Sequence, residues 1–407
     1  MSSTPLRGGR RAIIPLTIAT ALALSACAGT ETPAAGDGDF TGVDLTVWNI
    51  IPYDPYDTLQ KGYFAECATE LGITLTQETI PTDYQAKLLQ AASSNTFPDI
   101  ALVDSDVSFP QLASSGVLAD LGKLGITTEG QSEAVAALGD YDGTLYGLPT
   151  QVEDYALWYD KAAFAEVGIE EFPTTFDGLV DAAAKLTKEG RDGISLAGKN
   201  DGSTPVYFLP FLLSSGADPA DPSTAEAAIG LYKDLYDAGS LNKEFVNRGW
   251  EAPDVWKEGK AAITVTGPWE LVSGLEIDYG VAPFPTVTEG ESPRVGLLGY
   301  EYVLKAQKDD KRAQAAAALL QCRAAEANQI ETAIQGGYIP ALTSAQDAFV
   351  AEVPAAAGFV DQVAGAYNNA ELGTEWSALQ QVYVAAIQYA TVEGLSPKDA
   401  LAKAAQD

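Results

Sequence analysis

Strand and helix patterns alternate along the first third of the sequence, and this order constrains the fold more than any other feature. Residues 43–48 alternate apolar and polar side chains as a half-buried strand does, and residues 57–71 have the apolar spacing of a helix. A strand over 73–78, a helix over 83–93 and a short buried strand over 99–103 follow. This βαβαβ order predicts an α/β fold with a parallel sheet covered by helices.

The ends of these strands predict where a ligand binds, because ligands of such sheets lie at the carboxyl ends of the strands. Asp104 and Asp106 directly follow the third strand, and Trp48 closes the first. We therefore expect Asp104 and Asp106 on the ligand side. As turn residues the two acids would be ordinary, and Trp48 either lines the cleft or packs inside.

The remaining length predicts a second lobe. About 365 residues follow position 42, more than one hydrophobic core usually supports. Helices are predicted over 176–189, 225–238 and 253–258, with strands over 261–266 and 294–304. After these, one long alanine-rich helix is predicted over 308–330, then helices over 376–391 and 397–405, the last capped by Ser396.

The first residues predict the destination of the chain. Arg7, Arg10 and Arg11 precede an apolar stretch over 12–23, which is too short for a permanent membrane span. It ends in Leu24-Ser25-Ala26-Cys27, which resembles the lipobox of bacterial lipoproteins. The resemblance implies a signal peptide over 1–26, a lipid on Cys27, a flexible tether over 27–42 and an extracytoplasmic protein anchored to the cell membrane. An ordinary secretory signal is the alternative, and the choice between the general and twin-arginine export routes stays open.

Charge and composition exclude several classes of function. The chain has 24 basic and 56 acidic residues, so its surface repels nucleic acid. It has no histidine, which removes serine–histidine and cysteine–histidine nucleophile pairs and histidine-ligated zinc. We expect no cofactor and no metal site.

Four segments, in this order, carry a resemblance to a known family. They are Phe-Pro-Asp-Ile at 97–100, Tyr-Asp-Gly-Thr-Leu-Tyr-Gly-Leu-Pro at 141–149, Leu-Trp-Tyr-Asp-Lys at 157–161, and Glu-Gly-Lys-Ala-Ala-Ile from 258 with Gly-Pro-Trp at 267–269. The chain resembles the extracellular solute-binding lipoproteins of bacterial ABC sugar importers, the group of the maltose- and trehalose-binding proteins.

The resemblance implies a fold and a function. The fold is two Rossmann-like lobes joined by crossing hinge strands, as in type II periplasmic binding proteins, which close around their ligand by hinge bending. The implied function is sugar capture in the cleft and delivery to the ABC permease by a monomer that is not an enzyme. The expected lobes are 43–150 with 300–345 and 151–299 with 346–407, with crossings near 149–155, 295–299 and 341–349.

The resemblance also implies binding residues. A sugar needs carboxylates that accept hydrogen bonds from its hydroxyls and flat rings against its C–H faces. Glu153 matches a hydroxyl-binding glutamate on the hinge strand, with Asp154 as the alternative if the register slips, and Trp269 matches a stacking tryptophan. Further candidates are one of the neighbours Tyr207 and Phe208 as an aromatic stack, Trp376, and the pair Tyr300 and Glu301, which departs from an expected double glycine and either adds contacts or narrows the cleft.

A disulfide is a further possibility that the family topology raises. Cys67 lies on the inner face of the first helix, and Cys322 lies on the apolar face of the helix over 308–330, which that topology returns to the first lobe. The pair meets in an oxidising compartment, where a disulfide persists. Two separate buried thiols are the alternative.

Two other functions remain to be weighed. Glu153 with Asp104 or Asp106 imitates the carboxylate pair of a glycoside hydrolase. A non-sugar solute, such as a polyol phosphate or a peptide, is the second alternative, and a phosphate would need an arginine, for which Arg248 and Arg294 are the candidates. The sequence leaves open which sugar binds, its length and its linkage.

Overall fold

The larger sheet takes its strands from both halves of the chain. The computed structural model describes residues 39–106, 108–368, 372 and 375–407. Within them the sheet order is β12-β6-β11-β3-β1-β2, with β13 paired to β11. The strands are β1 Asp44–Asn49, β2 Thr74–Thr79, β3 Ile100–Asp104, β6 Gly147–Glu153, β11 Gly296–Leu304, β12 Ile339–Pro340 and β13 Tyr367–Asn368. β1 is parallel to β2 and β3, whereas β11 is antiparallel to its neighbours β3 and β6.

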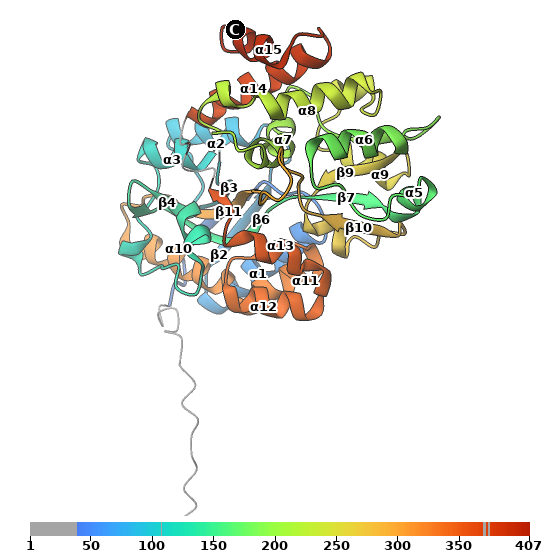
Figure 1. The fold of residues 1–407 in the computed structure, drawn as a ribbon. Coiled ribbons are helices and arrows are strands. Elements are labelled where there is room, and N and C mark those ends of the chain that lie inside the picture. Colours follow the sequence, from blue (N-terminus) through green and yellow to red (C-terminus); the bar gives the residue numbers. More distant parts are fainter. Residues whose placement is uncertain (1–38, 107, 369–371, 373–374) are drawn as a thin grey trace, which may run out of the picture. The chain divides into compact units, whose positions relative to one another are not determined.

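A second, smaller sheet has the order β10-β7-β9-β8. Its strands are β7 Ala156–Asp160, β8 Asp192–Ser195, β9 Ala261–Thr266 and β10 Tyr279–Ala282, and a separate hairpin joins β4 Asp140–Tyr141 to β5 Thr144–Leu145. β6 ends at Glu153 and β7 begins at Ala156, so the chain passes from the first sheet to the second within two residues. Figure 1 shows this passage, in green, between the two halves of the ribbon.

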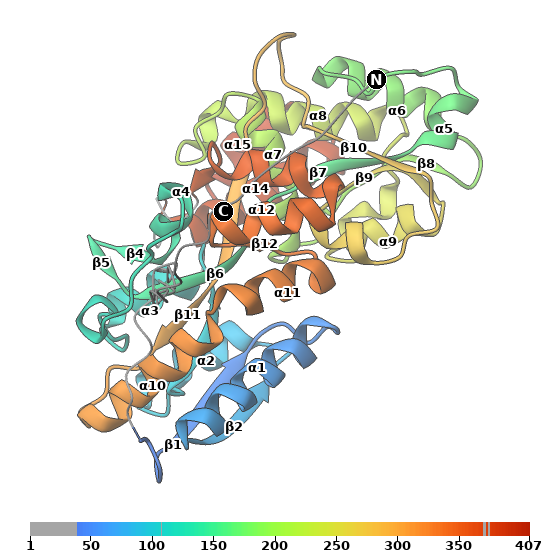
Figure 2. The same ribbon diagram turned by 90° about the horizontal axis from the view of Figure 1, so that it is seen from below.

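Helices cover both faces of the first sheet. α1 Tyr56–Leu71 and α10 Asp310–Arg323 pack on one face, where Phe64, Tyr302 and Leu319 are buried together. α2 Tyr84–Ser93 and α3 Ser108–Ser115 pack on the other, around Phe109 and Val103. Figure 2 shows α1 and α10 side by side, well apart from α5 to α9. This double cover explains why β3 is a continuous apolar run rather than an alternating one.

The second sheet is covered mainly by helices from the later parts of the chain. Its core contains side chains of α6 Phe176–Leu186, α7 Ser203–Ser214, α8 Glu226–Asp237, α14 Trp376–Thr391 and α15 Pro397–Ala404. The other helices are α4 Glu133–Ala136, α5 Lys161–Glu166, α9 Ala252–Lys257, α11 Glu326–Gly336, α12 Thr343–Glu352 and α13 Ala357–Val363. Short 3₁₀ turns are η1 Gly122–Leu124, η2 Ala137–Gly139, η3 Pro222–Thr224, η4 Lys243–Asn247, η5 Pro268–Val272 and η6 Pro354–Ala356.

The predicted order of strands and helices is confirmed, with one correction. The single helix expected over 308–330 is two helices, because α10 ends at Arg323 and Ala325 is extended. The side chains of Asn328 and Gln329 donate hydrogen bonds to carbonyl groups at the end of α10, those of Arg323 and Ala324. These bonds satisfy carbonyls that a helix end leaves unpaired, and they stabilise the break.

One further expectation, the third crossing, meets a different local structure, and another, the N-terminal signal and anchor, lies outside the described residues. Most of the third expected crossing, 341–349, is helical because it belongs to α12. The signal peptide over 1–26, Cys27 and the tether as far as position 38 fall outside the described residues. Within the described part of the chain, no helix combines the length and the apolar character that crossing a membrane requires.

Cys67 of α1 and Cys322 of α10 form a disulfide. Their Cα atoms are 5.9 Å apart, and the two residues are separated by 255 positions in sequence. The bond therefore joins the two helices that cover one face of the first sheet.

Candidate functional site

Glu153 ends β6 and is buried, with 7% of its surface exposed. All seven residues of β6 are buried, and the strand lies between β11 and β12 in the sheet. The Tyr155 hydroxyl donates a hydrogen bond of 3.1 Å to Glu153 Oε1. Burial raises the pKa of Glu153 to about 7, and the hydrogen bond from Tyr155 opposes that rise.

Aromatic rings from several elements surround this carboxyl group. The Tyr155 ring contacts Tyr207 of α7 at 5.5 Å and Trp269 of η5 at 5.7 Å between centroids, and Trp269 lies 5.9 Å from Tyr338. Burial, and after it the charge of Glu153, raises the pKa of Tyr155, Tyr207, Tyr300 and Tyr338. We call these six residues the Glu153 cluster: Glu153, Tyr155, Tyr207, Trp269, Tyr300 and Tyr338.

Asp106 lies in a second polar group, at the end of β3. It accepts hydrogen bonds from Trp376 Nε1 at 3.2 Å and from Gln380 Nε2 at 3.4 Å, both on α14. Burial, followed by the nearby charge of Asp104, raises the pKa of Asp106 to about 8. Asp104 itself accepts hydrogen bonds from the backbone N–H and the hydroxyl of Ser108, at the start of α3.

β11 lies between the strands that carry the two groups. Tyr300 of β11 is opposite Asp104 in β3, and Leu298 of β11 is opposite Glu153 in β6. Ser105, directly after β3, is bonded to β11, because its hydroxyl accepts a hydrogen bond of 2.9 Å from the Gly299 N–H. The structure thus brings predicted residues from both halves of the chain together on adjacent strands in the middle of the first sheet.

Two further candidate acids are completely buried. Asp154 accepts a hydrogen bond from Gln362 through one oxygen, and its other oxygen has no partner among the described residues. Neither carboxylate oxygen of Glu301 has such a partner. Burial raises the pKa of both groups, with the charge of Glu153 second for Asp154 and that of Asp104 second for Glu301.

Glu301 and Trp48 lie toward the α2 and α3 side of the sheet. A Cβ atom added to Gly147 would meet Glu301 at 2.8 Å and Phe109 of α3 at 3.1 Å, so only glycine fits between these side chains. Trp48 is half-buried and packs against the apolar cluster around Phe109. Tyr300, in contrast, belongs to the Glu153 cluster, so the two residues of the unexpected pair have different surroundings.

Sequence reasoning missed Tyr155, Tyr338 and Gln380. Tyr155 lies two residues after Glu153 in the passage to β7, and this spacing was the available signal. Tyr338 follows Gly337, whose φ is +76° and whose added Cβ atom would lie 2.3 Å from Trp269 Cα. The glycine therefore permits the close approach that places Tyr338 beside Trp269.

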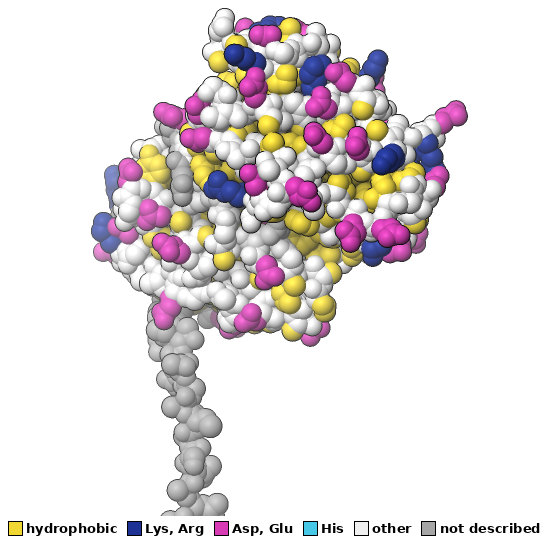
Figure 3. Space-filling view, viewed as in Figure 1, with side chains coloured by type: hydrophobic (Ala, Val, Ile, Leu, Met, Phe, Trp, Pro, Cys, Tyr) yellow, Lys and Arg dark blue, Asp and Glu magenta, His cyan; other side chains and the backbone are white. Residues whose placement is uncertain are grey.

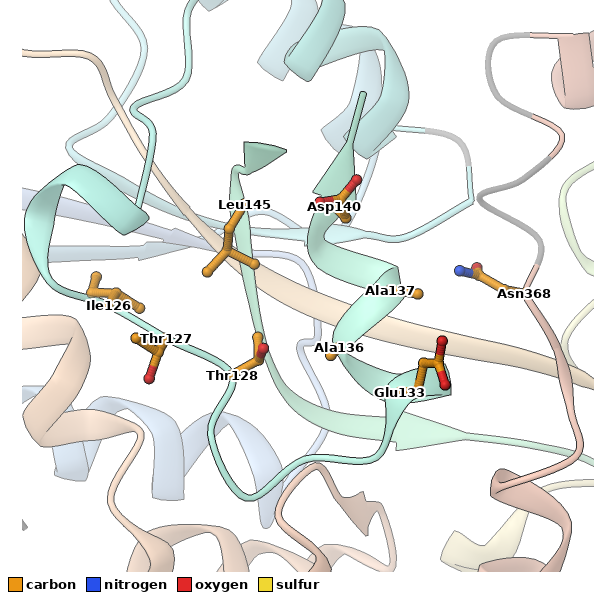
Figure 4. A pocket seen from close by; sticks show the side chains of 9 residues that line it. All are labelled: Ile126, Thr127, Thr128, Glu133, Ala136, Ala137, Asp140, Leu145 and Asn368. Carbon is orange, nitrogen blue, oxygen red and sulfur yellow. The ribbon is translucent and has the colours of Figure 1, made fainter. Parts of the chain in front are cut away.

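The structure also contains a pocket of about 640 Å³, which none of the predicted binding residues lines. Figure 4 shows Thr127, Thr128, Glu133, Asp140 and Asn368 around it, with small and aliphatic side chains between them. In the part of the chain that the structure describes, no group of three or more acidic, cysteine or histidine residues is arranged to hold a metal. Figure 3 shows more acidic than basic side chains on the visible face.

Comparison with known proteins identifies the family. Residues 62–359 match the family model described as bacterial extracellular solute-binding protein. The chain belongs to this family. The maltodextrin-binding protein MdxE of Bacillus subtilis is 27% identical over 350 residues, which are 80% of this chain and 79% of MdxE. A putative binding protein of Brucella abortus is 27% identical over 64% of this chain, and the match spans 66% of that relative's length, just under two thirds.

A solved structure shares the fold. The GacH receptor of Streptomyces glaucescens, studied without ligand and in complex with acarbose and an acarbose homologue, matches 89% of this chain and 96% of its own. The TM-score is 0.78 at 24% sequence identity. The expected fold class, the two-lobed α/β fold of type II periplasmic binding proteins, is confirmed.

Proposed function

We propose that this solute-binding protein is the substrate-binding component of an ABC importer, which captures a mono- or oligosaccharide and delivers it to the permease. The Glu153 cluster carries the proposal. A buried carboxyl group inside a ring of tyrosine and tryptophan side chains combines a hydrogen-bond acceptor for hydroxyls with flat surfaces for the C–H faces of a sugar.

The position of the cluster supports capture by closure. Glu153 and Tyr155 lie where the chain passes from the first sheet to the second, and Trp269 and Tyr207 come from elements that pack with the second sheet. A ligand that touches both sides stabilises the closed form by its higher affinity for that form. The relatives support the same reading, since MdxE is named for maltodextrin binding and GacH was solved with acarbose.

We propose binding rather than hydrolysis of the sugar. A hydrolase needs two carboxyl groups free to flank one glycosidic bond. Asp106, one member of the imitated pair, already accepts hydrogen bonds from Trp376 and Gln380, and these bonds hold it at the edge of α14. The sugar is therefore expected to be recovered intact.

A saccharide screen tests the proposal. A saturating ligand at about 1,000 times its dissociation constant should raise the free energy of unfolding by about 4 kcal/mol. Glu153→Ala and Trp269→Ala should each weaken binding by about 1.5–3 kcal/mol in titration calorimetry, with unchanged circular dichroism spectra. Unchanged affinity in both variants would place the sugar elsewhere. Release of reducing ends that Glu153→Gln abolishes would make the protein a hydrolase.

The protein is extracytoplasmic, as its family implies. We propose in addition that Cys27 carries a lipid that anchors the chain to the cell membrane, and that the protein acts as a monomer. The lipobox-like Leu-Ser-Ala-Cys sequence supports the anchor. Cys27→Ala should move the protein into the medium or block its processing, and a variant that stays in the membrane fraction like the wild type would refute the anchor.

A further inference from the structure

Buried acids around the candidate site lack cationic partners. Glu153, Asp154, Asp106 and Glu301 are all buried, and among the described residues no lysine or arginine forms an ion pair with any of them. Burying a carboxylate is costly unless it is paired, hydrogen-bonded or protonated. Glu153 and Asp106 therefore accept hydrogen bonds from neutral donors and have no cation beside them.

The same protein pairs buried acids in other places. Asp99, which is 3% exposed at the start of the third strand, is held by Arg312 in two hydrogen bonds of 2.7 Å. Glu270, equally buried, lies 3.0 Å from Lys257 Nζ. The missing cation at the site is thus a local feature and not a general property of this acidic chain.

Three basic side chains from elements near the second sheet are paired with acids outside the Glu153 cluster. Lys257 also pairs with Asp254 at 2.8 Å, and Arg248 pairs with Asp192 at 3.2 Å. Lys199 pairs with Asp201 at 3.3 Å. These cations balance acids outside the site and leave Glu153 without one.

The aromatic rings favour a positive charge as well. The faces of tyrosine and tryptophan rings attract cations, and groups of such rings recognise ammonium groups. In the Glu153 cluster, rings of this kind pack against one another next to a carboxyl group.

We propose that the solute bound at the Glu153 cluster is a saccharide that carries a protonated amine, an amino sugar or a related aminocyclitol. This inference rests on the proposed sugar-binding function and narrows its substrate class. Burial raises the pKa of Glu153 to about 7 and, together with the charge of Asp104, that of Asp106 to about 8, so protons compensate part of the charge there. An ammonium group would take over this compensation.

Matched pairs of sugars test the inference by titration calorimetry on the mature protein, slightly below neutral pH so that the amines are protonated. The pairs are glucosamine and glucose, the chitosan disaccharide and cellobiose, and trehalosamine and trehalose. The two members of each pair differ only in whether the same carbon carries an amine or a hydroxyl, at one carbon in the first and third pairs and at one carbon of each ring in the second. We expect the amine of at least one pair to bind about tenfold to a hundredfold more tightly, because hydrogen bonds to charged groups are stronger than neutral ones.

Variants assign the preference to the site. Glu153→Gln keeps the size of the side chain and removes its charge, so the preference for the amine over its matched neutral sugar should disappear, whatever the change in affinity for the neutral sugar itself. Glu66→Gln removes the same charge from an exposed position on α1 and should leave the preference unchanged. If Glu153→Gln does not fold, Asp106→Asn is measured in the same way.

The outcomes separate this inference from the proposed function. Neutral sugars that bind as tightly as their amine partners would overturn the amine and leave a sugar-binding protein. Binding of choline without binding of any saccharide would overturn the sugar and leave a cation-binding site. Failure of every probe, choline included, would overturn both.

Discussion

At the scale of single residues, Glu153 makes stability depend on pH. Its pKa in the folded chain is about 7 against the usual glutamate value of 4.5, so between these values the folded state holds a proton that the unfolded state has lost. The free energy of unfolding should therefore fall as the pH rises through this range, by up to about 3 kcal/mol from this residue. Urea unfolding at several pH values, with wild type and Glu153→Gln, measures the slope.

Asp106 contributes in the same direction up to about pH 8, so the variant should lose part of the slope and not all of it. An equal slope in wild type and Glu153→Gln would show that the carboxyl group is already ionised in the folded chain.

Trp250 has 54% of its surface exposed, which is unusual for a large aromatic residue. Its ring lies 5.6 Å from Tyr207, a member of the Glu153 cluster. We expect Trp250→Ala to weaken binding of oligosaccharides by about threefold to tenfold and to leave monosaccharides nearly unaffected, because an outer ring stacks only on a longer ligand. Calorimetry with sugars of increasing length checks this, and an equal loss for all lengths would contradict it.

Single residues of the site were partly predictable. Glu153, Trp269, Tyr207 and Tyr300 were identified from their place in the chain, and the structure brings them together. Tyr155 and Tyr338 were missed because ring packing across a passage between sheets has no periodic signal. Glu301 was predicted with Tyr300, but neighbouring residues on a strand face opposite ways, and its surroundings include Phe109 and Gly147.

At the scale of elements, Asp106 joins β3 to α14. Asp106→Ala would leave the buried Trp376 N–H without its acceptor and should cost about 1–3 kcal/mol of unfolding free energy. Trp376→Phe removes the same bond from the other side. A double-mutant cycle with urea unfolding should give a coupling energy of about 1 kcal/mol, and strictly additive losses would mean that the bond contributes nothing.

The disulfide between α1 and α10 should contribute strongly to stability. It closes a loop of 255 residues, for which the chain-entropy model gives a stabilisation of about 5 kcal/mol. Cys67→Ser, Cys322→Ser and the double variant should lose similar amounts in urea unfolding. The wild type should lose the same amount in reducing buffer, whereas the double variant should not respond to the reductant.

Helices and strands were predicted where one hydrophobic pattern repeats, and they were missed where individual side-chain hydrogen bonds decide the structure. The helix at 57–71 and the strand at 261–266 were predicted within one residue. The break between α10 and α11 was missed, because the alanine-rich sequence keeps its helical pattern across the two residues between these helices. The hydrogen bonds from Asn328 and Gln329 that stabilise the end of α10 leave no mark in that pattern. The antiparallel insertion of β11 was equally invisible, since it depends on residues far away in sequence.

At the scale of the whole molecule, binding should close the two lobes. Saturation with the correct sugar should change tryptophan fluorescence, because Trp269 and Trp376 belong to the groups that ligand or closure would touch. Small-angle scattering should show a smaller radius of gyration in the same titration. A protein that binds tightly with no change in either signal would bind without closing.

The place of β11 also bears on the moment when the protein leaves the cell. If the chain crosses the membrane unfolded and with its N-terminus first, β3 and β6 emerge early, whereas β11, the strand that separates them, follows only after every strand of the smaller sheet. The strands of the smaller sheet are therefore all outside the membrane before those of the larger one, in which the facing edges of β3 and β6 stay unpaired until β11 arrives.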